Sequence, residues 1–476
     1  MSSTHPEAGR LLGQGLFSNL SAFSDFEQRL RCLANTTQVG DAFEILVEAY
    51  LHTQQKMQAT NVWLVGQVPL RIRKRLNLPS DSKGIDGIFE TRGGELVPYQ
   101  VKYRTERDVL PYREVSSFLG VTERSCKDRV IFTNARELSK DVESRDGLRS
   151  VRASHFHALT SDDFAAIDAW LHERPVKQER RQPRSYQQEA VQKLAQALQQ
   201  RSRATAVMAC GTGKTLVALW VAEALEPKTV LVLVPSLALL SQTLPDWCRE
   251  SKWGESLEYL CVCSDPTVSK RVDAYTIRPQ DADFPITTDA RDVRRFLNRN
   301  TPGVKVVFST YQSAPVVAEG MKRLPPFDFG IFDEAHKTTG PQAGLFSFGL
   351  TDKTLPIAKR LFLTATPRHY DIRKRDREGD FRLVSMDDET VYGPVAYRLS
   401  FASAVKQGII CPYKIVISVT TKEEVDAKLL KHGITLVKRD KIQAQWVATQ
   451  LALKRAIQKT KASKVITFHS RVALAE

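Results

Sequence analysis

The sequence predicts an α/β protein in which an N-terminal α/β domain precedes a parallel-sheet domain. Three observations lead to this prediction. A buried strand, a glycine-rich turn and a helix follow one another from residue 204, and four later apolar runs each end in small polar residues. A hairpin pattern follows a helical pattern in the N-terminal part. Strands that alternate with helices are typical of a parallel sheet.

Length and composition are those of a globular protein with two or three domains. The chain has 476 residues, of which 42% are hydrophobic and 26% charged. No run of 18 or more apolar residues occurs, and the first residues lack the basic and apolar pattern of a signal peptide. We therefore expect a cytoplasmic protein that has no membrane partner.

Charge and cysteine spacing narrow the expected partners. The formal net charge of +15 favours a polyanion, and nucleic acid is the first expectation. The seven cysteines are scattered, and the close pair Cys261 and Cys263 has no second Cys or His pair at zinc spacing. Reduced thiols are therefore favoured over a zinc site.

The glycine-rich turn predicts a phosphate-binding site. The run "ATAVM" indicates a buried strand, "ACGTGKT" follows it, and "LVALWVAEAL" has helical spacing. In such a turn backbone N–H groups face a polyphosphate, lysine reaches the outer phosphates, and a threonine hydroxyl can hold Mg²⁺. A turn with an incidental lysine is less favoured, although Met208 stands where the consensus has glycine. The expected ATP-binding residues here are Gly211, Thr212, Gly213, Lys214 and Thr215, with Thr215 also a metal ligand.

An acidic pair follows one of the later strands. The apolar runs that begin at residues 229, 305, 327 and 359 predict parallel strands, whose carboxyl ends form the ligand-binding edge of an open α/β sheet. In "IFDEAH", we expect Asp333 to bind the Mg²⁺ that bridges the phosphates. Glu334 would position and deprotonate the attacking water. An isolated acidic pair is usually part of a solvated loop, but this one follows a phosphate loop.

Seven motifs between residue 184 and the end of the chain stand in a recognisable order. They are "RSYQQEA", "ACGTGKT", "VPSLALLSQ", "STYQS", "DEAH", "TATPR" and "ITFHSR". In this order they resemble superfamily 2 DEAH-box DNA helicases and translocases. The phrases "MACGTGKT", "LVPSLALLSQTLPDW" and "TATPRHY" look closest to the motor of type ISP restriction enzymes and related restriction helicases.

This resemblance implies roles for further residues. Gln187 would read the adenine of ATP, and His336, Thr364 and Thr366 would couple hydrolysis to DNA. Contacts with the nucleic-acid backbone are implied for Pro235, Ser236, Ser309 and Thr310.

Domain boundaries follow from composition and from the resemblance. We assign an N-terminal domain to residues 1–172, a linker to 173–183, a RecA-like ATP-binding lobe to 184–400 and the start of a second RecA-like lobe to 401–476. The polar stretch 368–400 is expected to be a long surface excursion. Superfamily 2 motors take arginine fingers from a later motif of the second lobe, and the sequence stops after "KVITFHSR". We therefore expect a fragment whose remaining second lobe, and any methyltransferase or target-recognition parts, lie downstream or on another chain.

The hairpin in "GIDGIFETRGGELVPYQVKYR" is a second candidate site. Its "RGG" turn joins two strands, and strand alternation puts Gln100 and Lys102 on one face. Upstream, "VGDAFEILVEAYL" predicts an amphipathic helix with Glu44 and Glu48 on one side. The plainer alternative is that Asp86 and Lys102 form an exposed ion pair across the hairpin.

The helix and hairpin together resemble the PD-(D/E)xK nuclease core in its Mrr-like form, in which glutamine replaces the second acid. By this resemblance Asp86 and Gln100 bind a divalent metal, and Lys102 orients water and stabilises the phosphate during cleavage. Glu44 would complete the site, with Asp41 or Glu48 as its substitutes. Oxygen ligands of this kind suit Mg²⁺.

These features predict an ATP- and Mg²⁺-dependent helicase or translocase on double-stranded DNA that is coupled to an endonuclease and acts in restriction or anti-phage defence. One alternative is a DNA remodelling helicase whose nuclease-like module binds DNA without cleaving it. An RNA helicase is a second alternative, which the DNA-nuclease-like hairpin disfavours. Lys102 favours cleavage, because inactive nucleases often lose this residue.

Overall fold

The structure is a computed structural model that describes residues 2–79, 84–105, 109–175, 180–263, 282–339, 344–368, 385–413, 441–460 and 463–465. The described residues as far as Ala404 form one compact unit. Those from Val405 onward belong to a second unit, which is described by itself.

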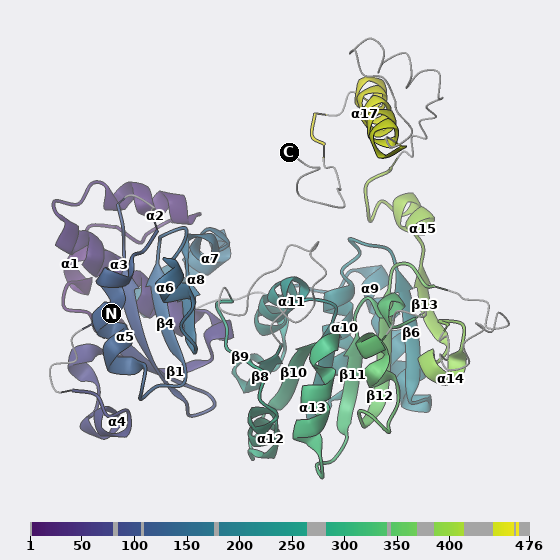
Figure 1. The fold of residues 1–476 in the computed structure, drawn as a ribbon, viewed down its shortest axis with the longest axis horizontal. Helices are drawn as coiled ribbons and strands as arrows, with labels where there is room; N and C mark the ends of the chain where they lie inside the picture. Colours follow the sequence, from purple (N-terminus) through teal and green to yellow (C-terminus); the bar gives the residue numbers. More distant parts are fainter. Residues whose placement is uncertain are drawn as a thin grey trace. The chain divides into compact units, whose positions relative to one another are not determined.

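A five-stranded mixed sheet forms the centre of the N-terminal domain (Figure 1). β2 pairs antiparallel with β1 and β3, whereas β4 pairs parallel with β3 and β5. The expected hairpin is confirmed as β2 and β3, with Gly87 opposite Tyr99. Gly94, at φ +73°, closes its turn by donating to the Thr91 carbonyl at 2.8 Å. The strands lie in chain order: β1 (Ala59–Leu64), β2 (Gly87–Thr91), β3 (Leu96–Lys102), β4 (Arg129–Thr133) and β5 (Leu148–Val151).

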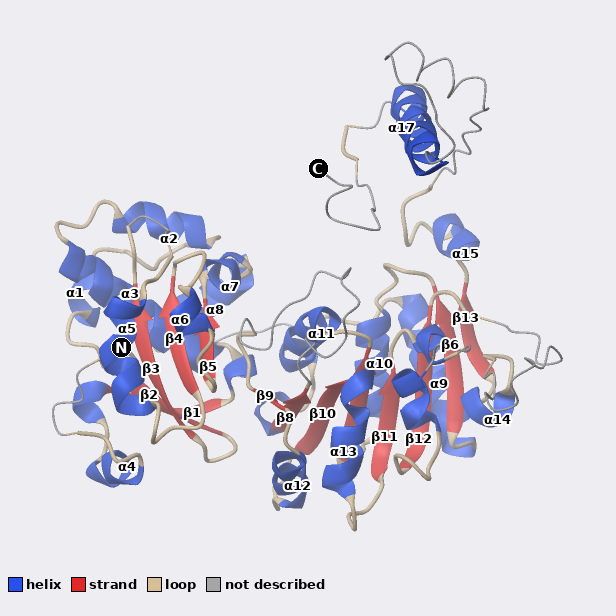
Figure 2. Ribbon diagram, viewed as in Figure 1, coloured by secondary structure: helices blue, strands red, loops and turns tan. Residues whose placement is uncertain are grey.

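Helices cover both faces of this sheet (Figure 2). One core packs α3 and α8 against Tyr99 and Val101, and the other packs α4 and α5 against Ile88 and Ile131. Successive residues of a strand point to opposite faces of the sheet. Apolar side chains of the hairpin therefore pack against helices on both faces. The helices are α1 (Ala8–Gly13), α2 (Phe23–Leu30), α3 (Thr36–Thr53), α4 (Leu70–Arg75), α5 (Tyr112–Thr122), α6 (Lys140–Glu143), α7 (Ala153–His157) and α8 (Ser161–Leu171).

α3 is the helix that the sequence predicts before the hairpin. It begins after Asn35, whose side chain accepts a hydrogen bond from the Gln38 N–H at 2.9 Å. Such a cap satisfies one of the N–H groups that a helix start leaves unpaired. The helix ends at Gln54, where the backbone becomes extended. α3 is thus a long helix whose start is capped by a hydrogen bond.

An eight-stranded parallel sheet forms the centre of the second domain (Figure 1). Its strand order is β13-β6-β12-β11-β7-β10-β8-β9, and every pair is parallel. The five strands that the sequence predicts are confirmed, and β8, β9 and β13 are added to them. The strands are β6 (Arg203–Met208), β7 (Thr229–Val234), β8 (Leu257–Val262), β9 (Ile286–Thr287), β10 (Val304–Thr310), β11 (Phe327–Phe332), β12 (Ile357–Thr364) and β13 (Val395–Leu399).

Helices also cover both faces of the parallel sheet (Figure 2), which makes this domain a doubly wound α/β fold. They are α9 (Ser185–Gln200), α10 (Lys214–Leu225), α11 (Leu237–Glu250), α12 (Ala290–Asn298), α13 (Ala314–Met321) and α14 (Glu389–Tyr392). The fold class predicted from the sequence is confirmed for this part of the chain.

The prediction of a surface excursion over 368–400 is wrong for its later part. α14 and β13 lie there, and β13 extends the sheet beside β6. An edge strand is covered less completely than a central one, so Val395 stays 42% exposed while Tyr397 and Leu399 are buried. Because exposed and buried residues alternate along β13, its sequence lacks the continuous apolar run that indicates a buried strand. Residues 369–384 lie outside the described residues.

The described end of the predicted linker forms hydrogen bonds with the parallel-sheet domain. The Arg180 guanidinium binds the Glu223 carboxylate at 2.9 Å. The backbone N–H of Arg181 donates to Glu250 at 2.6 Å. The acceptors lie on α10 and α11, so this end of the linker runs along the parallel-sheet domain. Residues 176–179 lie outside the described part.

Two helices lie at or beyond the end of the first unit, α15 (Phe401–Lys406) and α17 (Lys441–Thr460). The strand predicted at 464–471 falls outside the described residues except for its first two positions. Across the described ranges, no helix combines the length and apolar character needed to cross a membrane.

Candidate nucleotide and nuclease sites

The turn between β6 and α10 has the geometry of a phosphate-binding loop. Gly211 and Gly213 both adopt φ +80°, a left-handed conformation that a side chain disfavours. Lys214 is the first residue of α10, so unpaired N–H groups of the helix start adjoin the turn. Thr212 Oγ1 donates to the Ala209 carbonyl at 2.7 Å and closes the loop. The backbone of this turn can therefore bind a polyphosphate.

Helix α9 holds the predicted adenine reader against this loop. Tyr186 Oη and Gln187 Nε2 each donate to the Thr212 carbonyl at 3.1 Å. Gln187 Oε1 accepts from the Arg184 N–H at 2.9 Å. A Cβ built on Gly213 would lie 2.6 Å from Gln187 Nε2. Gln187 thus lies beside the phosphate loop, and both ends of its amide have partners within the protein.

Asp333 and Glu334 follow β11 at the edge where β6 ends. Burial, and then the charge of Glu334, raise the pKa of Asp333 to about 6. A hydrogen bond from His336 lowers the pKa of Glu334, with help from the charge of Lys214 and against the effect of burial. The Lys214 Nζ lies 3.9 Å from Glu334 Oε1. Asp333 therefore gains from a bound cation, and Glu334 stays ionised and able to orient water.

His336 links the acidic pair to the end of β12. Its Nδ1 lies 3.3 Å from Glu334 Oε2 and 3.1 Å from Thr364 Oγ1. The Thr366 N–H donates to the same hydroxyl at 3.2 Å. The residues predicted to couple hydrolysis to DNA thus form one connected set of contacts with the predicted general base.

Ser309 and Thr310 are less accessible than the sequence predicts. Their side chains are buried, because β10 is a central strand covered on both sides. Thr310 Oγ1 pairs with the Ser313 hydroxyl at 3.0 Å. Contact of Ser309 and Thr310 with nucleic acid stays a prediction, and in this structure their hydroxyls are buried. Pro235 is also buried, and Ser236 caps α11.

Asp86, Gln100 and Lys102 come together at one end of the β2–β3 hairpin. Asp86 directly precedes β2, and its Oδ2 accepts from the Val101 N–H, between the two other candidates, at 2.7 Å. Burial, and then the charge of Glu44, raise the pKa of Asp86 to about 7, while the Val101 hydrogen bond and the charge of Lys102 oppose this rise. Asp86 and Lys102 thus interact through their charges without the direct ion pair of the alternative interpretation.

The Gln100 side chain tests whether a metal fits here. It is 3% exposed, and its Oε1 is buried without a hydrogen-bond partner in the structure. An unpaired buried polar group costs about 1–3 kcal/mol, which a cation at this oxygen would relieve. The described residues contain no group of three or more His, Cys, Asp or Glu that could hold a metal. A metal here would therefore depend on the Gln100 amide oxygen together with the Asp86 carboxylate.

Glu44 and Glu48 of α3 have different surroundings. Glu48 is buried, and its carboxylate accepts hydrogen bonds from the Ser3 hydroxyl and from the Thr4 N–H and hydroxyl. Glu44 is 33% exposed and raises the pKa of Asp86 through its charge. Glu44 therefore remains a better candidate than Glu48 for completing the nuclease site, and Glu48 anchors the N-terminal segment.

His5 is a neighbour of this site that the sequence analysis misses. Its Nε2 lies 3.4 Å from Glu44 Oε2 and 3.9 Å from Asp41 Oδ1. Burial lowers the pKa of His5, but the hydrogen bond and charge of Glu44 outweigh it and raise the pKa above its ordinary value. No motif indicates this contact, because a histidine near the chain start carries no local pattern that points to α3.

Comparison with known proteins identifies the parallel-sheet domain. Residues 180–369 match the family described as type III restriction enzyme, res subunit (ResIII). This part of the chain is a ResIII helicase domain. "Probable helicase A859L" of African swine fever virus is 30% identical over 263 residues, which are 53% of this chain and 27% of the viral protein.

One solved structure extends the similarity beyond the ResIII domain. The structure described as "ATP-dependent Type ISP restriction-modification enzyme LlaBIII bound to DNA" has a TM-score of 0.64 and 29% identity. It covers 82% of this chain and 26% of that enzyme. A nuclease-deletion mutant of the Type ISP enzyme LlaGI is 37% identical over 48% of this chain and 18% of its own, with a TM-score of 0.40. The chain thus spans about a quarter of the length of the viral helicase and of LlaBIII.

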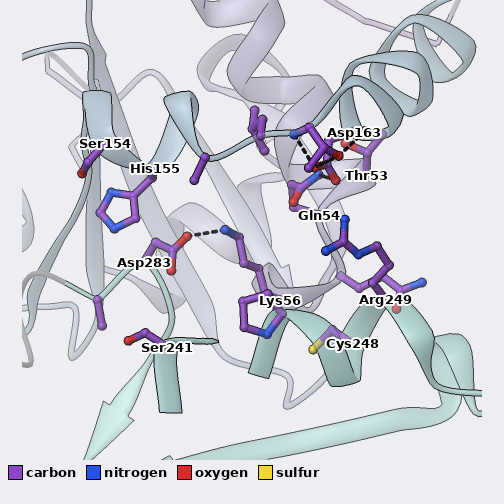
Figure 3. Close-up of a pocket in the computed structure, with 16 residues that line it drawn as sticks. Thr53, Gln54, Lys56, Ser154, His155, Asp163, Ser241, Cys248, Arg249 and Asp283 are labelled. Atoms are coloured by element: carbon purple, nitrogen blue, oxygen red, sulfur yellow. Dashed lines mark hydrogen bonds and ion pairs between the residues drawn. The ribbon is translucent and has the colours of Figure 1, made fainter. Parts of the chain in front are cut away.

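The ResIII domain contacts the N-terminal domain through a buried polar cluster (Figure 3). Figure 3 shows the pair formed by Lys56 Nζ and Asp283 Oδ2, which lie 2.5 Å apart. Tyr50 Oη donates to the same oxygen at 3.2 Å. Gln58 exchanges two hydrogen bonds with the backbone of Tyr259 at 3.1 and 3.2 Å. A cavity of about 300 Å³ beside this cluster is lined by both domains and includes none of the candidate catalytic residues.

Proposed function

We propose that this chain supplies the motor and the nuclease of an ATP-dependent translocase or helicase on double-stranded DNA, coupled to a Mg²⁺-dependent endonuclease in restriction or anti-phage defence. The ResIII domain and the similarity to Type ISP restriction-modification enzymes support the motor half. The observation that carries the nuclease half is the cluster of Asp86, Gln100 and Lys102 at one end of the hairpin.

The motor chemistry would use the phosphate loop and the acidic pair. The loop backbone and Lys214 would bind the phosphates of ATP. Thr215, the second residue of α10, and Asp333 would hold Mg²⁺, which suits the raised pKa of Asp333. Glu334 would orient the water that attacks the terminal phosphate. The contact of Glu334 with His336 would transmit the structural change that follows hydrolysis toward Thr364.

The nuclease chemistry would use the hairpin. Asp86 and the Gln100 Oε1 would hold Mg²⁺, with Glu44 nearby. When bound, this ion would lower the pKa of the attacking water and neutralise charge at the phosphate. Lys102 would place its ammonium group where negative charge develops as water adds to phosphorus and the bond to the leaving oxygen breaks.

The test measures plasmid nicking and ATP hydrolysis side by side in the intact enzyme with Mg²⁺ or Mn²⁺. The variants are Asp86→Ala and Lys102→Ala, and Lys140→Ala, an exposed lysine of α6, is the matched control. Loss of one group that stabilises developing charge costs about 10² to 10³ in rate, so nicking should fall by that factor while ATP hydrolysis is unchanged.

Two results would contradict the nuclease half. Cleavage that survives both hairpin substitutions would rule out the site. Loss of ATP hydrolysis together with nicking would show that the hairpin has a structural role. A parent enzyme that moves on DNA and never cuts it would favour the alternative of a remodelling helicase with a non-cleaving module. The motor half is tested by Glu334→Gln, which should keep ATP binding and remove hydrolysis.

A further inference from the structure

The N-terminal segment before α1 is fastened to α3 close to the candidate nuclease site. Ser3 Oγ donates to Glu48 Oε2. The Thr4 N–H and hydroxyl both donate to Glu48 Oε1, at 3.1 and 3.0 Å. Glu48 is 2% exposed, so these bonds satisfy a buried carboxylate and are costly to lose. The next residue, His5, is therefore held against the α3 turn before Glu48.

The hydrogen bonds of His5 define which ring nitrogen carries the proton. Its Nδ1 accepts from the Glu7 N–H at 3.2 Å, so this nitrogen is unprotonated in that contact. The proton of a neutral ring then lies on Nε2, which faces Glu44 Oε2 at 3.4 Å. The ring is 8% exposed, so water competes little for this contact. His5 thus donates toward Glu44 through a nitrogen whose orientation the chain itself fixes.

Glu44 needs such a partner, because it lies on the polar side of α3 and is one-third exposed. A free glutamate at this exposure samples several rotamers. Glu44 also acts on Asp86 through its charge, so its orientation affects the two carboxylates together. Carboxylate ligands of metals are generally held by a hydrogen-bond donor outside the ligand set, and loss of that donor typically costs about 10- to 100-fold in metal affinity or activity.

We infer that His5 is a positioning residue of the nuclease centre, which uses its Nε2–H to hold the Glu44 carboxylate ready for the divalent metal beside Asp86. This inference rests on the proposed nuclease function. Direct ligation by His5 is disfavoured, because one ring nitrogen accepts from the backbone and the other faces a carboxylate. The segment Ser3–His5 is then part of the active centre and not only a terminal arm of the fold.

The first experiment measures Mn²⁺ binding to the intact enzyme by calorimetry without nucleotide, so that metal bound with ATP does not contribute. His5→Ala should weaken binding by about 10- to 100-fold. His5→Gln should restore most of it, since the glutamine amide can donate from nearly the same position as Nε2. His52→Ala is the matched control, because His52 lies near the other end of α3 and stacks on Trp170 with ring centroids 4.5 Å apart. It should bind as the parent does.

A second readout is the Mg²⁺ concentration at half-maximal nicking, which should rise by the same factor in His5→Ala while ATP hydrolysis is unchanged. Parent-like metal binding in His5→Ala, with binding lost in Asp86→Ala, would overturn the role of His5 and leave the nuclease site standing. Equal losses in His5→Ala and His5→Gln would overturn it in favour of a structural role. Parent-like binding in Asp86→Ala, or no binding by the parent, would overturn the proposed site and this inference with it.

Discussion

Removal of the Asp86 charge should stabilise the metal-free protein. Burial and the charge of Glu44 raise the pKa of Asp86 to about 7, so the folded state disfavours the ionised carboxylate. In the parent, Asp86 Oδ2 accepts a hydrogen bond from the Val101 N–H at 2.7 Å. Asp86→Asn removes the charge and keeps an oxygen that can accept this bond. The variant therefore isolates the electrostatic cost that the candidate site imposes on the fold.

The magnitude follows from proton linkage. The pKa of Asp86 rises from an ordinary value of 3.8 to about 7, and each unit corresponds to about 1.36 kcal/mol. Below pH 3.8 both states are protonated, and the charge costs nothing. Between that pH and about 7 the folded state holds a proton that the unfolded state has lost, so the advantage of asparagine grows by up to about 1.4 kcal/mol per pH unit. Above pH 7 it levels off at about 4 kcal/mol, and partial exposure of Asp86 should reduce this to about half.

The assay is thermal unfolding of the parent and of Asp86→Asn from pH 5 to 8, with chelator and then with Mn²⁺. In chelator, the difference in the transition of the N-terminal domain should increase up to pH 7 and then stay constant, by about 2–4 °C for each kcal/mol. Mn²⁺ should raise the transition of the parent and not that of the variant. A difference independent of pH, or a variant less stable than the parent at pH 8, would refute the reasoning.

Three further outcomes are expected. Gly213→Ala should weaken ATP binding at least about tenfold in a fluorescent-nucleotide titration, because the new Cβ meets Gln187 at φ +80°; unchanged affinity would contradict this. Lys56→Met should destabilise the protein to denaturant by about 3–5 kcal/mol by leaving Asp283 buried without its cation, and adding Asp283→Asn should recover much of the loss. DNA affinity of the intact enzyme should fall steeply with salt, with a log–log slope of about −0.9 per phosphate contact, and a salt-independent affinity would count against a charge-driven footprint.

Five strands of the parallel sheet, β6, β7, β10, β11 and β12, were predictable from the sequence because each is an apolar run that ends in a functional motif. β13 gives a weaker signal, because it follows a polar stretch and pairs at the edge of the sheet. The burial of Ser309 and Thr310 depends on the helices that cover β10, and the strand sequence carries no information about them.

The candidate nuclease site also has a part that the sequence could predict and a part that it could not. Strand alternation and a short turn are local rules, and they suffice to predict that Gln100 and Lys102 share a face near Asp86. The distinction between Glu44 and Glu48 is not local. Both lie on one side of α3, and only the folded N-terminal segment, which caps one carboxylate and faces the other, separates their roles.

The buried polar cluster at Asp283 also bears on how the candidate nuclease site and the motor belong together. A buried ion pair contributes little net stability relative to apolar packing. Its contribution here is to the relative orientation of the groups that it joins. Asp283 binds Lys56 and Tyr50 through its carboxylate and Arg149 through its carbonyl at 3.2 Å, and these bonds admit one arrangement where apolar side chains would allow sliding. Tyr50 lies on the same helix as Glu44, six residues further along, about 9 Å at the rise of an α-helix. Helix α3 therefore carries both Glu44 of the candidate nuclease site and Tyr50, which contacts the ResIII domain at Asp283.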